Sequence, residues 1–427
     1  MPVTEMTTAE VPEVYRRFAT AVGSKHWQGA VARQEEAIQS NPFLGDYLRS
    51  EYTIAYQLDR LRNLIADRGV VPHEVCIDPN IFRSMAFAAQ VLGVMQRRST
   101  TKQAKTFVKR VRTAFSNHNE MHGLHLELQA ATHFARRQQH VAWHRATNGG
   151  TFDLLIENLG PNGLEVECKS ISEGKGRRIH RSDALAFWGE LWKDVAGITQ
   201  NLHSGLAVVL TVPYRLPEDA EDRSALVRQV IGRIVAGSGA TLSGGAEVRI
   251  EPFDPAKIEL AQANGRKEWI KSITAATKTE NRETAVYGIP AGGMLAFVIQ
   301  SAVEDDVLDQ VFATLDESAA RQFTTKRGAL FWVELQGLDA NQLLSLHDQD
   351  SDLGKQPSRL KLEVNEFLHR APSHIVGVVF CSKSGLFPEV NGSTDSGGAT
   401  NFFLKETSPF WHASFRGPLR AMGTTKS

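Results

Sequence analysis

The sequence predicts an α/β protein in which a mixed sheet, flanked by helices, follows an all-helical N-terminal domain. In the first part of the chain, apolar residues recur at helical spacing, for example at Ile54, Leu58 and Leu61. Later, helical patterns alternate with short apolar runs, which is typical of a sheet covered by helices. The apolar runs that predict buried strands are 206–212, 329–335 and 374–381.

The chain is long enough for more than one domain, because it has 427 residues. We expect a helical accessory domain at 1–116 and an α/β core at 117–215. Residues 216–427 then form either an extension of that core or a separate C-terminal domain. The stretch 263–293 is polar and is expected to consist mostly of loops.

Composition excludes several classes of protein. Lys and Arg together number 48, as do Asp and Glu, so no overall charge attracts nucleic acid or membrane, and such binding needs local patches. Cys76, Cys168 and Cys381 lie far apart, which argues against a disulfide framework or a cysteine zinc cluster. No apolar run approaches the roughly 18 residues that span a bilayer, and the N-terminus lacks the pattern of a signal peptide. We therefore expect a soluble, cytoplasmic protein without a membrane partner.

A hairpin is predicted where two apolar runs flank a turn rich in Gly, Pro and Asn, at 151–172. Because side chains alternate along a strand, Glu165, Glu167 and Lys169 share one face of the second strand. Asp153 on the first strand is expected to point toward Glu167. The alternative is a hydrated polar edge of a surface hairpin.

Two carboxylates brought together need a cation between them, because like charges at short range repel or raise one another's pKa. Mg²⁺ or Mn²⁺ fits, since such ions take oxygen ligands from one or two carboxylates and leave positions for water and phosphate. Lys169 would then help to orient a bound water and to stabilise charge on a phosphate.

These residues resemble the signature of the PD-(D/E)xK, or restriction-endonuclease-like, nuclease superfamily. Asp153 matches the Asp of that signature, and Glu167-Cys168-Lys169 matches Glu-x-Lys. The resemblance implies a restriction-endonuclease-like α-β-β-β-α-β core from residue 117 to about 214. It also implies that the carbonyl of Cys168 is a metal ligand.

A helix is expected just before the first strand of this core, at 117–139. In the superfamily such a helix often contributes an acid, and Glu127 is a better candidate than Glu120 because its distance to the strand resembles the family spacing. The alternative is a surface glutamate. The same helix carries histidines that suggest zinc, but their spacing is not that of a zinc protease, and we expect them to be solvated. They are His118, His122, His125 and His133.

Two basic segments are candidates for contact with a phosphate backbone. The first is a Gly-broken loop after the Glu-x-Lys strand, with Lys175, Arg177, Arg178 and Arg181. The second is a helix with Lys102, Lys105 and Lys109, in a stretch without acids from 92 to 118. The alternatives are a flexible surface loop and a hydrated helix face.

The sequence therefore predicts a Mg²⁺- or Mn²⁺-dependent nuclease that hydrolyses phosphodiester bonds. The resemblance implies DNA rather than RNA, in bacterial restriction, repair or phage defence. The alternative is a nucleic-acid-binding or scaffolding subunit of a multi-protein defence or repair system, with an unused site. A homo-oligomer or a partner protein is left open.

Overall fold

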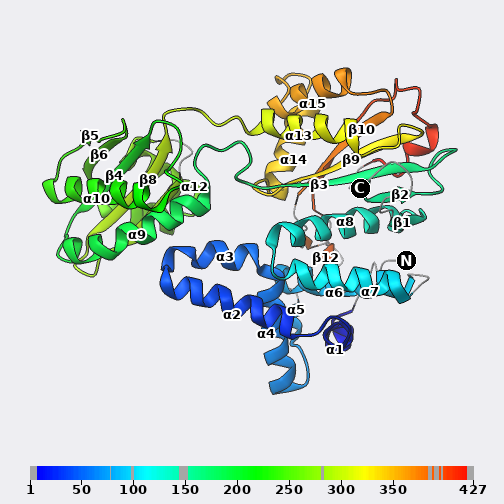
Figure 1. The fold of residues 1–427 in the computed structure, drawn as a ribbon, viewed down its shortest axis with the longest axis horizontal. Helices are drawn as coiled ribbons and strands as arrows, with labels where there is room; N and C mark the ends of the chain where they lie inside the picture. Colours follow the sequence, from blue (N-terminus) through cyan, green and yellow to red (C-terminus); the bar gives the residue numbers. More distant parts are fainter. Residues whose placement is uncertain are drawn as a thin grey trace. The chain divides into compact units, whose positions relative to one another are not determined.

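The computed structural model describes residues 7–76, 78–97, 101–143, 152–279, 283–382, 387–388, 394–395 and 398–420 (Figure 1). The chain divides into two compact units. The core unit contains Met1–Glu35, Arg49–Lys175 and Leu308–Ser427, and the inserted unit contains Glu36–Leu48 and Gly176–Val307. The inserted unit thus begins within 117–215, the range predicted as one core.

The N-terminal part is helical, as predicted. Its elements are η1 (Thr8–Glu10), α1 (Val11–Val22), α2 (Lys25–Ser40), η2 (Pro42–Leu44), α3 (Gly45–Glu51), α4 (Thr53–Arg68), α5 (His73–Cys76), α6 (Pro79–Arg97), α7 (Thr101–Ala114) and α8 (His118–Arg136). Within the core unit, the Trp27 ring packs 5.6 Å from the rings of both Phe18 and Phe115. Helix α7 buries Phe107 and Val111 against this cluster, and these residues form its apolar stripe.

Helix α8 packs against both the N-terminal helices and the six-stranded sheet. Asn117 caps its N-terminus by accepting hydrogen bonds from the amides of Asn119 and Glu120. Leu124 and Leu128 pack with the N-terminal helices, whereas residues such as Leu126, Ala130 and Phe134 pack on the sheet. Both faces of α8 therefore pack against other elements, and the polar side chains of His122, His125 and Glu127 are buried there.

The sheet of the core unit has six strands in the order β1-β2-β3-β9-β10-β13. Their bounds are β1 (Val141–Trp143), β2 (Leu154–Ile156), β3 (Leu164–Ile171), β9 (Gly328–Leu335), β10 (Ile375–Cys381) and β13 (Thr400–Leu404). Strands β1, β2 and β3 are antiparallel, β3, β9 and β10 are parallel, and β13 is antiparallel to β10. The predicted strands at 329–335 and 374–381 are thus confirmed, and they continue the sheet of the hairpin.

Helices cover this sheet on both faces. On the face opposite α8, the rings of Phe312 and Phe367 lie 5.7 Å apart and pack near Phe331 and Phe380. Phe312 belongs to α13 (Val307–Arg321) and Phe367 to α15 (Arg359–Arg370). The remaining elements of this unit are α14 (Ala340–Ser351), the short pair β11 (Phe387–Pro388) and β12 (Thr394–Asp395), and η3 (Ala413–Phe415).

The inserted unit contains a five-stranded mixed sheet in the order β5-β6-β4-β8-β7. Its elements are α9 (Arg181–Thr199), β4 (Gly205–Val212), α10 (Ala220–Ala236), β5 (Ala240–Thr241), β6 (Glu247–Phe253), α11 (Pro255–Ala263), α12 (Arg266–Thr277), β7 (Glu283–Gly288) and β8 (Met294–Ser301). Helices α9 and α10 pack against one face, and α11 and α12 form a smaller cluster with Met294. The expectation of loops at 263–293 is wrong, because α12 and β7 occupy most of that stretch.

Strand β4 corrects another expectation. The apolar run 206–212 was expected to complete the sheet of the hairpin, but it pairs with β6 and β8. The parallel neighbour of β3 is β9, which follows the inserted unit and α13. Both β4 and β9 are apolar runs buried on both faces, so hydrophobicity alone could not identify which one pairs with β3.

The two ends of the inserted segment meet at Gly176 and Val307. The Asp306 amide donates a hydrogen bond to the Gly176 carbonyl at 3.0 Å. Gly176 has φ +76°, and a Cβ at this position would lie 2.6 Å from Cα of Val307. Only glycine fits this close approach, which keeps the entry and exit of the segment side by side.

Candidate functional site

The β2–β3 hairpin places Asp153 beside Glu167, as predicted. Leu154 pairs with Val166 in the antiparallel ladder, so the residues on either side of this pair, Asp153 and Glu167, are neighbours. The Asp153 amide donates a hydrogen bond to the Val166 carbonyl at 3.1 Å. Oδ2 of Asp153 accepts a hydrogen bond from the Cys168 amide at 2.9 Å. These bonds hold the carboxyl against the strand that carries Glu167.

The acids of β3 are buried. Leu164 and Val166 lie in the core beneath α8, and the acids alternate with them. Glu165 is 0% exposed and Glu167 is 3% exposed. The alternative of a hydrated polar edge is therefore wrong for both residues.

Glu165 has a structural environment. It accepts hydrogen bonds from the amide and the hydroxyl of Thr324, and the Arg327 Nε lies 3.1 Å from its Oε1. Thr324 and Arg327 belong to the connection between α13 and β9. Glu165 therefore ties this connection to β3, and its carboxylate is fully used by protein groups.

Glu167 is only partly satisfied. Its Oε1 lies 2.8 Å from Nζ of Lys169, while its buried Oε2 has no hydrogen-bond partner among the described residues. Burial raises the pKa of Glu167, and Lys169 opposes this effect. A buried carboxylate oxygen without a partner is costly, which indicates that a proton or a cation belongs there.

Glu127 lies at the same site, on α8. Both its oxygens accept hydrogen bonds from the guanidinium of Arg110 at 2.6 Å, in the forked geometry that arginine and carboxylate favour. Nε of Arg110 donates a further hydrogen bond to Glu120 at 2.5 Å. The alternative of a surface glutamate is wrong, because Glu127 is 5% exposed.

The electrostatics of Asp153 show that the three acids form one cluster. Burial raises the pKa of Asp153 to about 8, and the carboxyls of Glu127 and Glu167 add to this effect. The Cys168 amide and Arg110 oppose it. Near neutral pH this carboxyl therefore tends to hold its proton, which a bound cation would have to displace.

The donor set fits a hard divalent ion with few protein ligands. Asp153 and Glu167 offer oxygens, and Mg²⁺ is often held by one or two carboxylates plus water. Burial raises the pKa of the Cys168 thiol well above its usual range, so a thiolate ligand is disfavoured. In the described part of the chain, no group of three or more His, Cys, Asp or Glu side chains is arranged to hold a metal. An ion held by Asp153 and Glu167 alone would take water for its remaining ligands.

Sequence reasoning missed two polar residues near this cluster. Arg110 lies between the apolar stripe and the lysines of α7, and nothing in the helical pattern singles it out. Glu334 is a lone charge in the apolar strand β9, which was a usable signal. It is 0% exposed, its Oε1 has no partner among the described residues, and its Oε2 lies 3.3 Å from the hydroxyl of Ser170.

The arginines of the basic loop lie in the inserted unit beside acids. The Arg178 guanidinium lies 3.1 Å from Asp306 Oδ2 and donates to the Glu304 carbonyl at 3.0 Å. Nη1 of Arg181 lies 3.8 Å from Glu283 Oε2. These contacts reduce the positive charge that the loop offers to a phosphate.

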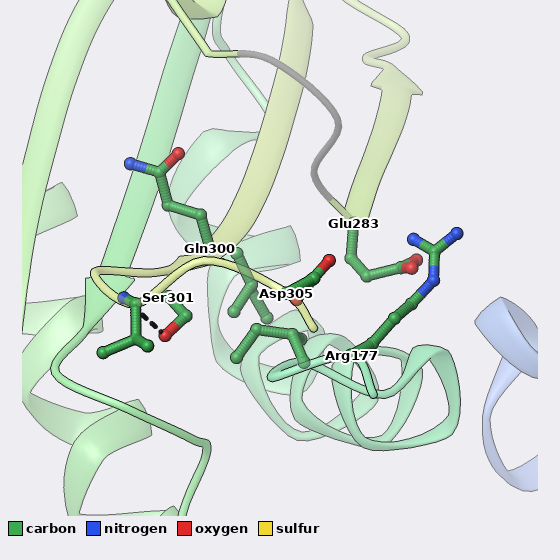
Figure 2. A pocket seen from close by; sticks show the side chains of 8 residues that line it. Arg177, Glu283, Gln300, Ser301 and Asp305 are labelled. Carbon is green, nitrogen blue, oxygen red and sulfur yellow. Dashed lines mark hydrogen bonds between the residues drawn. The ribbon is translucent and has the colours of Figure 1, made fainter. Parts of the chain in front are cut away.

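A shallow pocket of the inserted unit is lined by part of the same loop (Figure 2). Arg177 and Ile179 form one wall, and Glu283, Ser301 and Asp305 are among the other lining residues. Figure 2 shows the side chains of Arg177 and Glu283 close to one another. Because two acids accompany one arginine, this pocket is not an anion site.

The other basic candidates differ in exposure. On α7, Lys105 and Lys109 are exposed, as a phosphate-binding face requires. The side chain of Lys102 lies outside the described residues. Lys175 forms the last residue of the core-unit segment before Gly176, and its amide donates to the Ser172 carbonyl at 3.0 Å.

The expectation of solvated histidines on α8 is wrong for His122 and His125, which are each 4% exposed. Nε2 of His122 lies 3.2 Å from Oε2 of Glu51. Nε2 of His133 is 2.9 Å from the Pro418 carbonyl. These are internal polar contacts of a helix that is covered on both faces.

Within the described part of the chain, none of the helices is long and apolar enough to cross a membrane. Comparison with protein-family models, curated proteins and solved structures finds no match. The function is therefore argued from the site itself.

Proposed function

We propose that this protein is a Mg²⁺-dependent nuclease, with Mn²⁺ as an alternative ion, that hydrolyses phosphodiester bonds of nucleic acid. The observation that carries the proposal is the pairing of the half-buried Asp153 with the buried Glu167 across the hairpin, with Lys169 at 2.8 Å from Glu167. The ion pair of Glu167 and Lys169 is largely buried, and burying charges is costly, so it needs a function or a strong structural reason. Glu165, on the same strand, is a structural acid by contrast, because both of its oxygens have protein partners.

The topology supports the same proposal. In the core unit, α8, β1, β2, β3, α13 and β9 follow one another in the order α-β-β-β-α-β, interrupted by the inserted unit. This is the order expected for a restriction-endonuclease-like core. Asp153 directly precedes the second strand of that order and Glu167 lies on the third, which resembles the placement of the acids in the superfamily.

The chain's own residues would act as follows. Asp153 and Glu167 would hold the ion, which supplies positive charge beside the phosphate and lowers the pKa of bound water. Lys169 would hold its ammonium next to the reacting phosphate. In the net reaction one water is added across a P–O bond, which gives a phosphate monoester and a free hydroxyl.

We propose DNA as the substrate, in a bacterial restriction, repair or phage-defence setting, on the resemblance alone. The test is to incubate the purified protein with plasmid, linear duplex, single-stranded DNA and RNA, each with Mg²⁺, Mn²⁺ or chelator. Cleavage of DNA that stops with chelator is expected.

A second candidate is a nucleic-acid-binding or scaffolding subunit with an unused site. Two observations favour it. Arg178 and Arg181 lie beside acids, which reduces the charge they offer to a phosphate. The guanidinium of Arg110 is bonded to both oxygens of Glu127. Retention of DNA without metal-dependent cleavage of any of the four substrates would support this candidate and overturn the nuclease.

A further inference from the structure

Arg110 supplies positive charge to the acidic cluster of Glu127, Asp153 and Glu167 without any bound ion. Its three nitrogens each contact a carboxylate of α8: Nη1 and Nη2 donate to Glu127, and Nε donates to Glu120. The side chain of Arg110 is 16% exposed and that of Glu127 is 6% exposed. The pair is therefore a desolvated, bidentate contact, which is far stronger and better fixed than a surface ion pair.

The acids of the cluster thus fall into two groups. Each oxygen of Glu127 accepts a hydrogen bond from the guanidinium, which uses one lone pair on each oxygen and weakens both as ligands for an ion. Glu167 is the opposite case, with Oε2 buried and without a partner among the described residues. Removing one partner of a buried pair is strongly destabilising, because it leaves the other charge unpaired.

We infer that Arg110 is a positioning residue that keeps Glu127 out of the ligand set, so that the site binds a single divalent ion through Asp153 and Glu167. The guanidinium already supplies positive charge to both oxygens of Glu127, so a second ion would have to compete with it for this carboxylate. This inference rests on the proposed function, and it departs from the expectation that Glu127 is itself a metal ligand.

The test measures Mn²⁺ binding to the full chain by isothermal titration calorimetry and by electron paramagnetic resonance. Wild type is expected to bind one ion. Asp153→Asn is expected to lose binding by more than about 100-fold, which exceeds the usual effect of residues that only support ligands. The charge-balanced double variant Arg110→Met/Glu127→Gln removes the pair without changing net charge, and its affinity should fall by no more than about 10- to 100-fold.

The matched control is Arg416→Met/Glu406→Gln. It removes an exposed ion pair of the same unit, in which Nη2 of Arg416 lies 2.6 Å from Oε2 of Glu406. Circular dichroism checks that each variant is folded. Glu127→Gln alone is the second variant if the double variant does not fold, and it should also keep one ion.

A loss of Mn²⁺ affinity in folded Glu127→Gln or in the double variant as large as that in Asp153→Asn would make Glu127 a ligand and overturn the inference. Two ions bound to wild type would overturn it as well. Wild type that binds no Mn²⁺ and cleaves no nucleic acid would instead refute the proposed function, and this inference with it.

Discussion

The Cys168 amide donates a hydrogen bond to Oδ2 of Asp153 at 2.9 Å, so the middle residue of Glu-Cys-Lys fixes the aspartate on the neighbouring strand. Only the backbone of Cys168 is needed for this bond. The relation between Asp153 and Glu167 is therefore set by the hairpin register. A substitution that keeps the shape of Asp153 can remove its charge without removing this hydrogen bond.

Asp153→Asn should abolish most cleavage while the protein stays folded. The amide oxygen of Asn can still accept the bond from Cys168, but the neutral side chain holds a divalent ion poorly. Metal-assisted stabilisation of charge on phosphate is worth several kcal/mol, so a rate loss of at least about 1,000-fold is expected. Plasmid cleavage by the variant at saturating Mg²⁺ measures it, and a rate within tenfold of wild type would place the chemistry elsewhere.

Glu165→Gln and Glu167→Gln, two substitutions on one strand, should have opposite effects. Glu165 is fully buried between Thr324 and the half-buried Arg327, so Glu165→Gln weakens its charge-assisted contacts and should destabilise the fold by about 1 to 3 kcal/mol. Glu167→Gln removes a charge from an acidic cluster, so the ion-free protein should be as stable as wild type or more stable.

Thermal melting with and without Mg²⁺ distinguishes the two substitutions. Mg²⁺ should raise the melting temperature of wild type and of Glu165→Gln, because an ion that binds only the folded state stabilises it by mass action. Glu167→Gln should lose most of this gain. The assignment of roles would be reversed if Glu165→Gln, and not Glu167→Gln, became insensitive to Mg²⁺.

The hairpin and its acids were predictable because they depend on local rules. Side-chain alternation and turn composition are enough to place Asp153 and Glu167 together, and the structure has both features. Burial was not predictable in the same way. The sequence around Glu165 does not show that Thr324, some 160 residues later, bonds to it.

The features that the sequence did not predict are contacts between residues far apart in the chain. Strand β9 is the partner of β3, yet residues 176–307 separate them and contain a second apolar strand of similar character, β4. Likewise, Arg110 is one base among several on α7, and only the packing of α7 on α8 turns it toward Glu127. Local patterns identify the elements, but tertiary contacts decide their partners.

The basic segments should differ in how they affect the salt dependence of DNA binding. Lys105→Ala/Lys109→Ala should weaken binding and reduce the slope of log affinity against log salt by about 0.7 to 0.9 for each phosphate that the variant no longer neutralises. Arg178→Ala should leave the slope unchanged, because Arg178 is held by Asp306 and by the Glu304 carbonyl. Arg177→Ala and Arg181→Ala test the rest of the loop. Fluorescence anisotropy over a series of salt concentrations measures the slopes, and a lower slope for Arg178→Ala would show that its internal bonds open on binding.

The stability of the ion-free protein should fall as pH rises from about 4 to about 8. Burial and the carboxyls of Glu127 and Glu167 raise the pKa of Asp153 to about 8 in the folded state, against about 3.9 in an unfolded chain. Between these values the folded state binds a proton that the unfolded state does not, so each rise in pH favours unfolding.

Asp153→Asn has no such proton to lose. Its advantage over wild type in urea unfolding should therefore grow by at least about 1 kcal/mol from pH 5 to pH 8. Saturating Mg²⁺ should reverse the ranking of wild type and variant at pH 8, since the ion stabilises the ionised carboxylate. Stability curves that stay parallel across this pH range would show that Asp153 is ionised throughout.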